Sequence, residues 1–121
     1  MDEATGLPNK NKCEELLSAP EMITMPVGVC SFDLNNLRRI NNSMGHEKGD
    51  AYIRIFAELV REAVPVHYFV GRAGGDEFIA IMDGADKEEM QRCLQLIRDR
   101  VDAYNAANPD FPVSYAVGIS V

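Results

Sequence analysis

The 121-residue sequence has little positive charge, and this limits the partners it suits. It holds 12 lysines and arginines against 19 aspartates and glutamates, a formal net charge of −7. Binding to DNA or RNA depends on basic side chains that neutralise phosphates, so a nucleic-acid polymer is an unsuitable partner. A small phosphorylated ligand is compatible with this charge, because helix N-termini and an acid-bound divalent cation hold phosphate.

Paired cysteines, long apolar runs, internal repeats and low-complexity segments are also missing. Cys13, Cys30 and Cys93 are far apart and form no C-x-x-C pair, which indicates reduced thiols of a cytoplasmic protein. No apolar run reaches membrane-spanning length, and no signal-peptide pattern opens the chain. The sequence therefore predicts a cytoplasmic domain without membrane contact of its own, tethered to a membrane only through other domains.

Apolar periodicity and turn residues predict one α+β domain over residues 1–121. Helices are expected over 10–17, from after Leu34 to Gly45, over 51–64 and over 87–107, and strands over 27–34, 67–72, 77–82 and 113–121. Segment 46–50 is expected to be a loop in which Asp50 caps the next helix. Because 67–72 and 77–82 form a hairpin, the sheet should be mixed and mainly antiparallel, with helices packed on it.

Three carboxylates stand next to apolar strands. Asp33 ends one strand, and Asp76 and Glu77 begin another. Asp33 could cap a helix, Asp76 could be an ordinary turn residue, and Glu77 could form an ion pair. Arg72, across the hairpin, is the partner that this ion pair would use. Together the acids favour a metal site, because Asp33 and Asp76 would meet at one end of the sheet and repel unless a cation such as Mg²⁺ lies between them.

Two glycines, Gly74 and Gly75, precede these acids. They suit a tight turn, and without side chains they let a flat or charged ligand lie on the backbone and take its N–H groups. Successive strand residues point to opposite sides, so Asp76 and Glu77 can have different tasks. One acid can hold a metal while the next meets a substrate hydroxyl.

The motifs resemble those of the GGDEF domain, the diguanylate cyclase family. The family signature matches AGGDEF at 73–78, and its opening D-x-L-T-G-L-x-N-R is similar to DEATGLPNK at 2–10. Its F-D-x-D-x-F-K-x-I-N-D-x-x-G-H-x-x-G-D resembles FDLNNLRRINNSMGHEKGD at 32–50, and its closing S-x-G strand resembles SYAVGIS at 114–120. The resemblance covers nearly the whole chain and implies a palm-type fold related to nucleotidyl cyclases and polymerases.

The resemblance also implies an activity, a diguanylate cyclase (nucleotidyltransferase) that condenses two GTP to cyclic di-GMP and two pyrophosphates. Each domain would hold one GTP with Mg²⁺ or Mn²⁺, and two domains would face each other as a homodimer. An upstream sensor domain is expected in a longer protein. The alternatives are a GTP-binding regulatory GGDEF module with weak or no catalysis, and a nucleotide-free dimerisation domain.

The resemblance assigns roles to individual residues by position. The metal ligands correspond to Asp33, Asp76 and the backbone carbonyl of Leu34. Glu77 corresponds to the acid that assists deprotonation of the 3′-hydroxyl. The other matches are substrate-binding positions: Asn41 and Asp50 for guanine, Asn36, Leu37 and Arg38 at a helix start for phosphates, and Gly74 and Gly75 against the nucleotide.

The sequence departs from the family pattern inside the domain at three places. Asn35 stands where a second Asp is common, with a modest expected effect on metal binding, and Leu37 replaces the usual Phe. The product-inhibition motif R-x-x-D would fall at 65–68, where PVHY lacks both charges. No inhibitory site of that type is therefore expected.

Two further expectations concern the ends of the chain. Asp2 is implied to pair with Arg72 and to tie the N-terminal motif to the hairpin. The chain stops at Val121, before the family's last helix and strand, which bring basic residues to the triphosphate. Weak turnover and an exposed sheet edge or apolar surface are expected in consequence.

Overall fold

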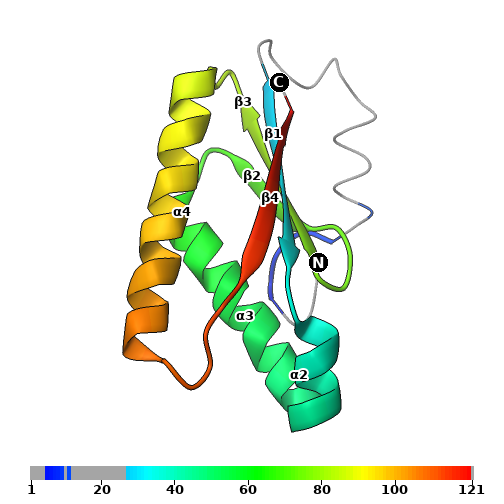
Figure 1. Cartoon of the computed structure of the whole chain (residues 1–121). Helices are drawn as coiled ribbons and strands as arrows, with labels where there is room; N and C mark the ends of the chain where they lie inside the picture. The colour runs from blue at the N-terminus through cyan, green and yellow to red at the C-terminus, as the bar shows by residue number, and fades with distance from the viewer. Residues whose placement is uncertain (1–4, 10, 12–26, 121) are drawn as a thin grey trace.

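The fold is an antiparallel sheet with helices on one face, as a computed structural model of residues 5–9, 11 and 27–120 describes it. The elements are β1 (Val27–Leu34), α2 (Leu37–Met44), α3 (His46–Ala63), β2 (Phe69–Arg72), β3 (Glu77–Asp83), α4 (Lys87–Ala107) and β4 (Tyr115–Ser120). The strand order is β2-β3-β1-β4, and each neighbouring pair is antiparallel (Figure 1). This confirms the predicted α+β class. The helix expected over 10–17 lies almost wholly outside the described residues. Asp2, the expected partner of Arg72, also lies outside them.

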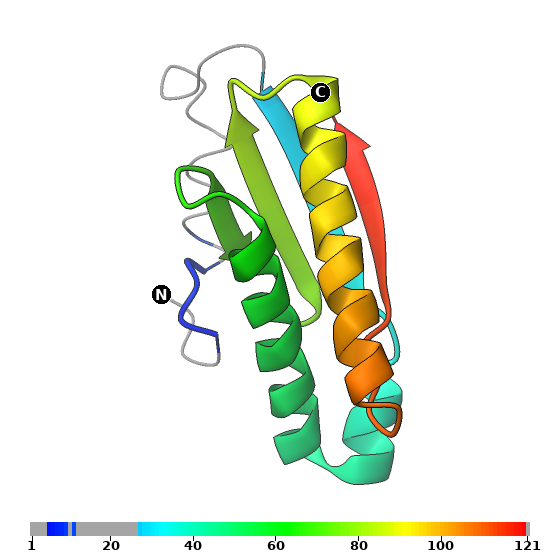
Figure 2. The same ribbon diagram turned by 90° about the vertical axis from the view of Figure 1, so that its left-hand side faces the viewer.

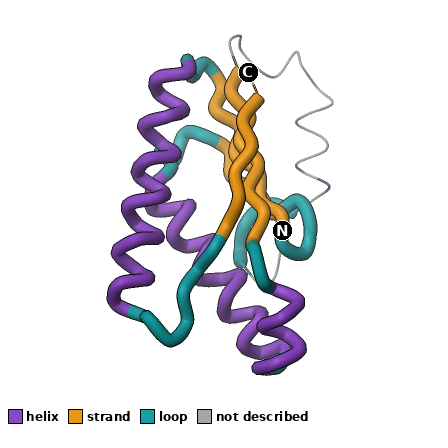
Figure 3. Tube along the Cα trace, viewed as in Figure 1, coloured by secondary structure: helices purple, strands orange, loops and turns teal. Residues whose placement is uncertain are grey.

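Helices α3 and α4 cover one face of the sheet, and α2 lies beyond its lower end (Figures 2 and 3). The core between these layers is built on aromatic side chains that are fully buried, among them Phe32, Phe56 and Phe78. The Phe56 ring meets Phe78 edge-on, with 5.3 Å between ring centroids, and lies 6.1 Å from Phe32. Burial of such rings supplies much of the driving force for folding.

The close approach of α4 to β1 depends on a glycine. A Cβ atom built on Gly28 would overlap the Sδ of Met90 and lie 2.8 Å from its Cγ. Met90 is fully buried. The missing side chain at Gly28 therefore lets α4 pack directly on the sheet.

The predicted helix over 87–107 is confirmed residue for residue. It begins at an N-cap, Asp86, whose carboxylate accepts a hydrogen bond from the Glu89 N–H at 2.9 Å. Helix α3 ends at Ala63, before Pro65, which has no N–H to continue it.

The loop predicted over 46–50 is wrong, because these residues form the start of α3. Gly45 alone separates α2 from α3, with φ at 89°. Asp50 therefore lies inside the helix and is not its N-cap, and His46 is the first helical residue instead of a loop residue. The sequence shows two glycines here, and only Gly45 breaks the helix.

Strands β2 and β4 begin two residues later than predicted, at Phe69 and Tyr115. The Tyr68 N–H donates to the Pro65 carbonyl in a turn at 3.1 Å. The Val113 N–H donates to the side chain of Asn105 at 2.7 Å. Both groups are satisfied outside the sheet, so pairing starts after them.

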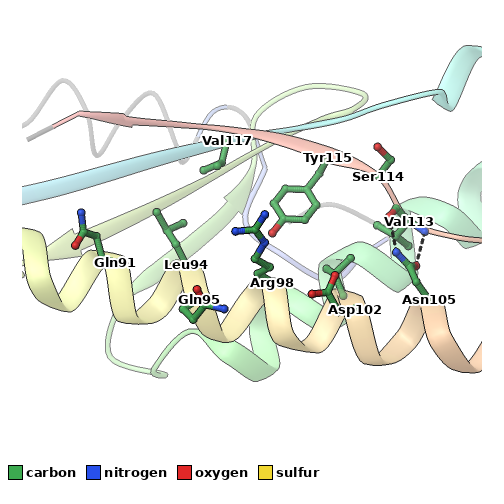
Figure 4. A pocket seen from close by; sticks show the side chains of 11 residues that line it. Gln91, Leu94, Gln95, Arg98, Asp102, Asn105, Val113, Ser114, Tyr115 and Val117 are labelled. Atoms are coloured by element: carbon green, nitrogen blue, oxygen red, sulfur yellow. Dashed lines mark hydrogen bonds between the residues drawn. The ribbon is translucent and has the colours of Figure 1, made fainter.

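A groove of about 650 Å³ lies between α4 and β4 (Figure 4). Tyr115 and Arg98 point into it from opposite walls, and none of the predicted site residues lines it. Val117 and Ile119 on β4 are 44% and 50% exposed. Among the described helices, none is both long and apolar enough to cross a membrane.

Candidate functional site

The predicted acids lie at one end of the β1–β3 pair. The register sets Asp33 directly opposite Glu77. One residue further on, the Leu34 N–H donates to the Asp76 carbonyl, with 2.8 Å between nitrogen and oxygen. Segments far apart in the sequence thus bring three carboxylates to the same end of the sheet.

Alternation along the strands sets the direction of two of these acids. Phe32 and Leu34 are buried on the helix side, so Asp33 between them faces the other side and is exposed. Glu77, its cross-strand partner, is exposed on the same face. The sequence predicts Asp33 close to Asp76, whereas the register makes Glu77 the residue directly across from Asp33.

Two ordinary explanations of these acids lose support. Helix α2 has Asn36 at its N-cap and no side chain bonded there, so Asp33 is not a helix cap. The Arg72 guanidinium donates to the carbonyls of Gly74 at 3.1 Å and Gly75 at 2.8 Å. Arg72 therefore orients the hairpin turn through its backbone.

The hairpin turn has no internal need for its two glycines. Neither Gly74 nor Gly75 has a positive φ. A Cβ on Gly75 would meet nothing within 4 Å, and one on Gly74 would make only an ordinary 3.5 Å contact with Glu77. The turn therefore suits glycine but does not require it at either position. That a ligand lies on the bare backbone stays a prediction.

The start of α2 is suited to an anion. Asn36 adopts a left-handed conformation with φ at 71°, and no side chain caps the helix. The first turn carries no acid, Leu37 packs against the core and Arg38 is exposed. An uncapped N-terminus directs N–H groups and partial positive charge outward.

A hydrogen-bond network that sequence reasoning missed anchors the end of β1. The buried Tyr52 hydroxyl on α3 donates to the Asn35 carbonyl at 2.8 Å and accepts the Ser114 N–H at 3.0 Å. The Asn35 side-chain N–H donates to the Ser114 hydroxyl at 3.0 Å. Asn35 thus acts as a donor, which a carboxylate at this position would not be. No local sequence signal marks Tyr52, because its partners Asn35 and Ser114 are distant in sequence.

The two residues expected to read guanine come from adjacent helices. Asn41 of α2 is half-buried, and its side chain lies against Gly49 of α3. Asp50 follows Gly49 and is exposed, and it borders a hollow of about 490 Å³ with Lys48 and Arg54. The fold therefore places the Asn41 side chain against Gly49, the residue that precedes Asp50.

The carboxylate and carbonyl oxygens at the end of the β1–β3 pair are of the ligand type that a hard divalent cation prefers. Within the described residues, no three His, Cys, Asp or Glu side chains are close enough to hold a metal by themselves. Mg²⁺ commonly uses one or two carboxylates, with waters and substrate phosphates completing its shell. The family resemblance assigns Asp33, Asp76 and the Leu34 carbonyl to that partial set, and this assignment stays a prediction.

Comparison with known proteins identifies the family of the chain. The family model "Diguanylate cyclase, GGDEF domain" matches residues 1–121. A diguanylate cyclase of Vibrio cholerae is 30% identical over 103 residues, which are 82% of this chain and 32% of that protein. The chain thus spans about a third of that relative's length.

Solved structures share the fold. The active GGEEF domain of a diguanylate cyclase from Vibrio cholerae is 26% identical, with a TM-score of 0.74 over 93% of this chain and 75% of that chain. The GGDEF domain of DgcB from Caulobacter crescentus, solved in complex with c-di-GMP, is 23% identical, with a TM-score of 0.81 over 98% of this chain and 75% of that chain. The motifs, the sheet order and the family match agree, and the chain belongs to the GGDEF domain family of diguanylate cyclases.

Proposed function

We propose that the chain is a diguanylate cyclase domain, which condenses two GTP to cyclic di-GMP and two pyrophosphates with Mg²⁺ and as a homodimer. The observation that carries the proposal is the position of Asp33 and Glu77, which oppose each other on the exposed face at one end of the sheet. Like charges directly opposite destabilise a sheet, so this pair needs a reason outside folding. A bound cation and nucleotide supply that reason.

The reaction is two equivalent nucleotidyl transfers. In each, the 3′-oxygen of one GTP forms a bond to the α-phosphorus of the other, the bond between that phosphorus and the oxygen leading to the β-phosphate breaks, and pyrophosphate leaves. The 3′-hydroxyl gives up a proton, and we assign its acceptance to Glu77, whose carboxylate is exposed. The second transfer closes the ring.

Metal and phosphate binding fall to the ends of β1 and β3 and the start of α2. Asp33, Asp76 and the Leu34 carbonyl would hold Mg²⁺, which when bound neutralises phosphate charge and stabilises the attacking and leaving oxygens. The uncapped N–H groups that follow Asn36 would take phosphate oxygens. Arg38, exposed on the same turn, would add a positive charge.

Guanine selection falls to Asn41 and Asp50. A carboxylate accepts the ring N–H and the amino group of guanine, and an amide both donates and accepts. Adenine lacks the ring N–H and has its amino group elsewhere, so a site with these groups discriminates against ATP. This assignment rests on the family pattern together with the closeness of the two helices.

The symmetry of the product supports the homodimer. Cyclic di-GMP has two equivalent linkages, and two copies of the domain, each holding one GTP, would bring the two molecules together head to tail. A two-fold arrangement presents the same surface from each copy. The exposed face that carries Asp33 and Glu77 is the surface that would meet its partner.

The test is to incubate the purified protein with GTP and Mg²⁺ and to separate the products by chromatography with mass detection. Reactions with ATP, and with EDTA in excess over Mg²⁺, are the controls. One cyclic di-GMP for every two pyrophosphates supports the proposal. GTP binding without product would identify a regulatory module instead, and the absence of both binding and product would contradict the proposal.

A further inference from the structure

Gly49 stands inside α3, where a glycine needs an explanation. It lies in the first turns of an 18-residue helix, and it has no positive φ. Glycine weakens a helix interior relative to alanine, because it loses more backbone freedom on folding. The backbone conformation therefore does not account for Gly49.

The Asn41 side chain supplies the explanation. A Cβ atom on Gly49 would overlap the Asn41 Oδ1 and lie 2.8 Å from its Cγ. Gly49 is buried, and the side chain of the half-buried Asn41 occupies this space. By contrast, a Cβ on Gly75 would meet nothing within 4 Å. Because Gly49 has no side chain, the Asn41 amide can occupy this position.

The main chain on both sides of this contact is held. The Gly45 N–H donates to the Asn41 carbonyl at 3.1 Å, and the Gly49 N–H donates to the Gly45 carbonyl at 3.2 Å. These bonds fix α2 and α3 at their junction. The steric overlap between a methyl group at position 49 and Asn41 would therefore be relieved mainly by rotation of the Asn41 side chain. Such a rotation would redirect both polar atoms of the amide.

We infer that Gly49 is a positioning residue for guanine recognition: it leaves the space in which the Asn41 amide is held against α3, at the residue that precedes Asp50. The inference deepens the proposed function and rests on its assignment of Asn41 to the base. It makes the glycine a determinant of nucleotide preference, although glycine has no side chain to touch the nucleotide.

The test is a double-mutant cycle with Gly49→Ala, Asn41→Ala and the double variant, in which the affinities for Mg–GTP and Mg–ATP are measured by calorimetry. We expect each single variant to lower the ratio of GTP to ATP affinity by about tenfold, the scale of one lost hydrogen-bonding group. The double variant should lose no more than either single variant, because both act through the same amide.

The inference would be overturned if Gly49→Ala kept the wild-type ratio of GTP to ATP affinity, or if the losses of the two single variants multiplied in the double variant. In either case a lower ratio in Asn41→Ala would still support the assignment of Asn41 to guanine. An unchanged preference in Asn41→Ala would overturn both the inference and the assignment of Asn41. Urea unfolding gives an independent check on the packing. Gly49→Ala should lower the unfolding midpoint when Asn41 is present and raise it when position 41 is alanine. The same change in both backgrounds would also overturn the inference.

Discussion

The backbone N–H of Leu34 donates to the carbonyl oxygen of Asp76, with 2.8 Å between the two atoms. This bond extends the β1–β3 ladder by one step past the opposed acids Asp33 and Glu77. Because it joins main-chain atoms, it survives replacement of any of the acidic side chains. The acids can therefore be changed one at a time on an intact scaffold.

Asp33→Asn should separate stability from function. Without metal, removing one of two directly opposed charges should raise the free energy of unfolding by roughly 0.2–1 kcal/mol. The stabilisation that Mg²⁺ with GTP gives to the wild type should be lost, together with product formation. Urea unfolding with and without Mg–GTP measures both effects. A variant that is less stable than the wild type without metal would indicate a structural role for Asp33 instead.

Gly75→Ala should weaken nucleotide binding and leave the fold intact. Its new methyl group meets nothing within 4 Å in the protein, so stability should stay within about 0.5 kcal/mol of the wild type. On the surface where the nucleotide lies, the same methyl group should raise the KM for GTP about tenfold, a loss of about 1.4 kcal/mol.

Gly28→Ala is the matched control for that variant. Here the methyl group overlaps Met90 in the core, so it should cost about 1–3 kcal/mol of stability. The KM of the folded fraction should not change. An unchanged KM for GTP in Gly75→Ala would count against a nucleotide lying on the hairpin.

Tyr52→Phe removes the hydroxyl that joins α3 to Asn35 and Ser114. The loss leaves a backbone N–H and a carbonyl without this partner, and it should lower the free energy of unfolding by about 1–3 kcal/mol. Tyr104→Phe is the control, because within the described residues the Tyr104 hydroxyl makes no such bonds. Equal stability losses in the two variants, measured by urea unfolding, would refute the anchoring role of Tyr52.

Stability should fall at alkaline pH for a reason visible in the core. Burial raises the pKa of the Cys30 thiol from 9.0 to about 11. Burial, with a hydrogen bond to Glu89, raises the pKa of Tyr68 from 10.0 to about 12. Both groups are held neutral in the fold, so their contribution is complete below the unfolded-state pKa and is lost as pH rises through the folded one.

The free energy of unfolding should therefore decline from about pH 9 toward pH 12. Urea unfolding at several pH values measures this decline. Tyr68→Phe should make it shallower above pH 10 and leave the lower part unchanged. A stability that is flat across this range would contradict the assignment.

Local sequence signals predicted most of the elements. The helix over 87–107 is correct at both ends, because an Asp86 cap, an apolar stripe and a following Asn-Pro coincide. The loop prediction for 46–50 was wrong because glycine normally breaks helices. Gly49 is kept in the helix by its contact with Asn41 on another helix, and contacts of that kind have no local signature.

The sequence indicated which residues belong to the candidate site, but it did not indicate how they are paired across the strands. The acids stand out because apolar strands surround them. Their pairing depends on register, and a shift of one residue would have placed Asp76 rather than Glu77 opposite Asp33. The supporting Tyr52 hydroxyl joins segments distant in sequence, so only the folded structure reveals it.

The most direct test of the account compares the wild type with Glu77→Gln in two measurements on the same preparations: the affinity for Mg–GTP, and the rate of cyclic di-GMP formation at saturating GTP. The amide keeps the size of the side chain but accepts no proton at neutral pH. The account predicts an affinity unchanged within about twofold and a kcat lower by about a hundredfold or more, the usual contribution of a general base. Cyclic di-GMP formation by Glu77→Gln at the wild-type rate would contradict it.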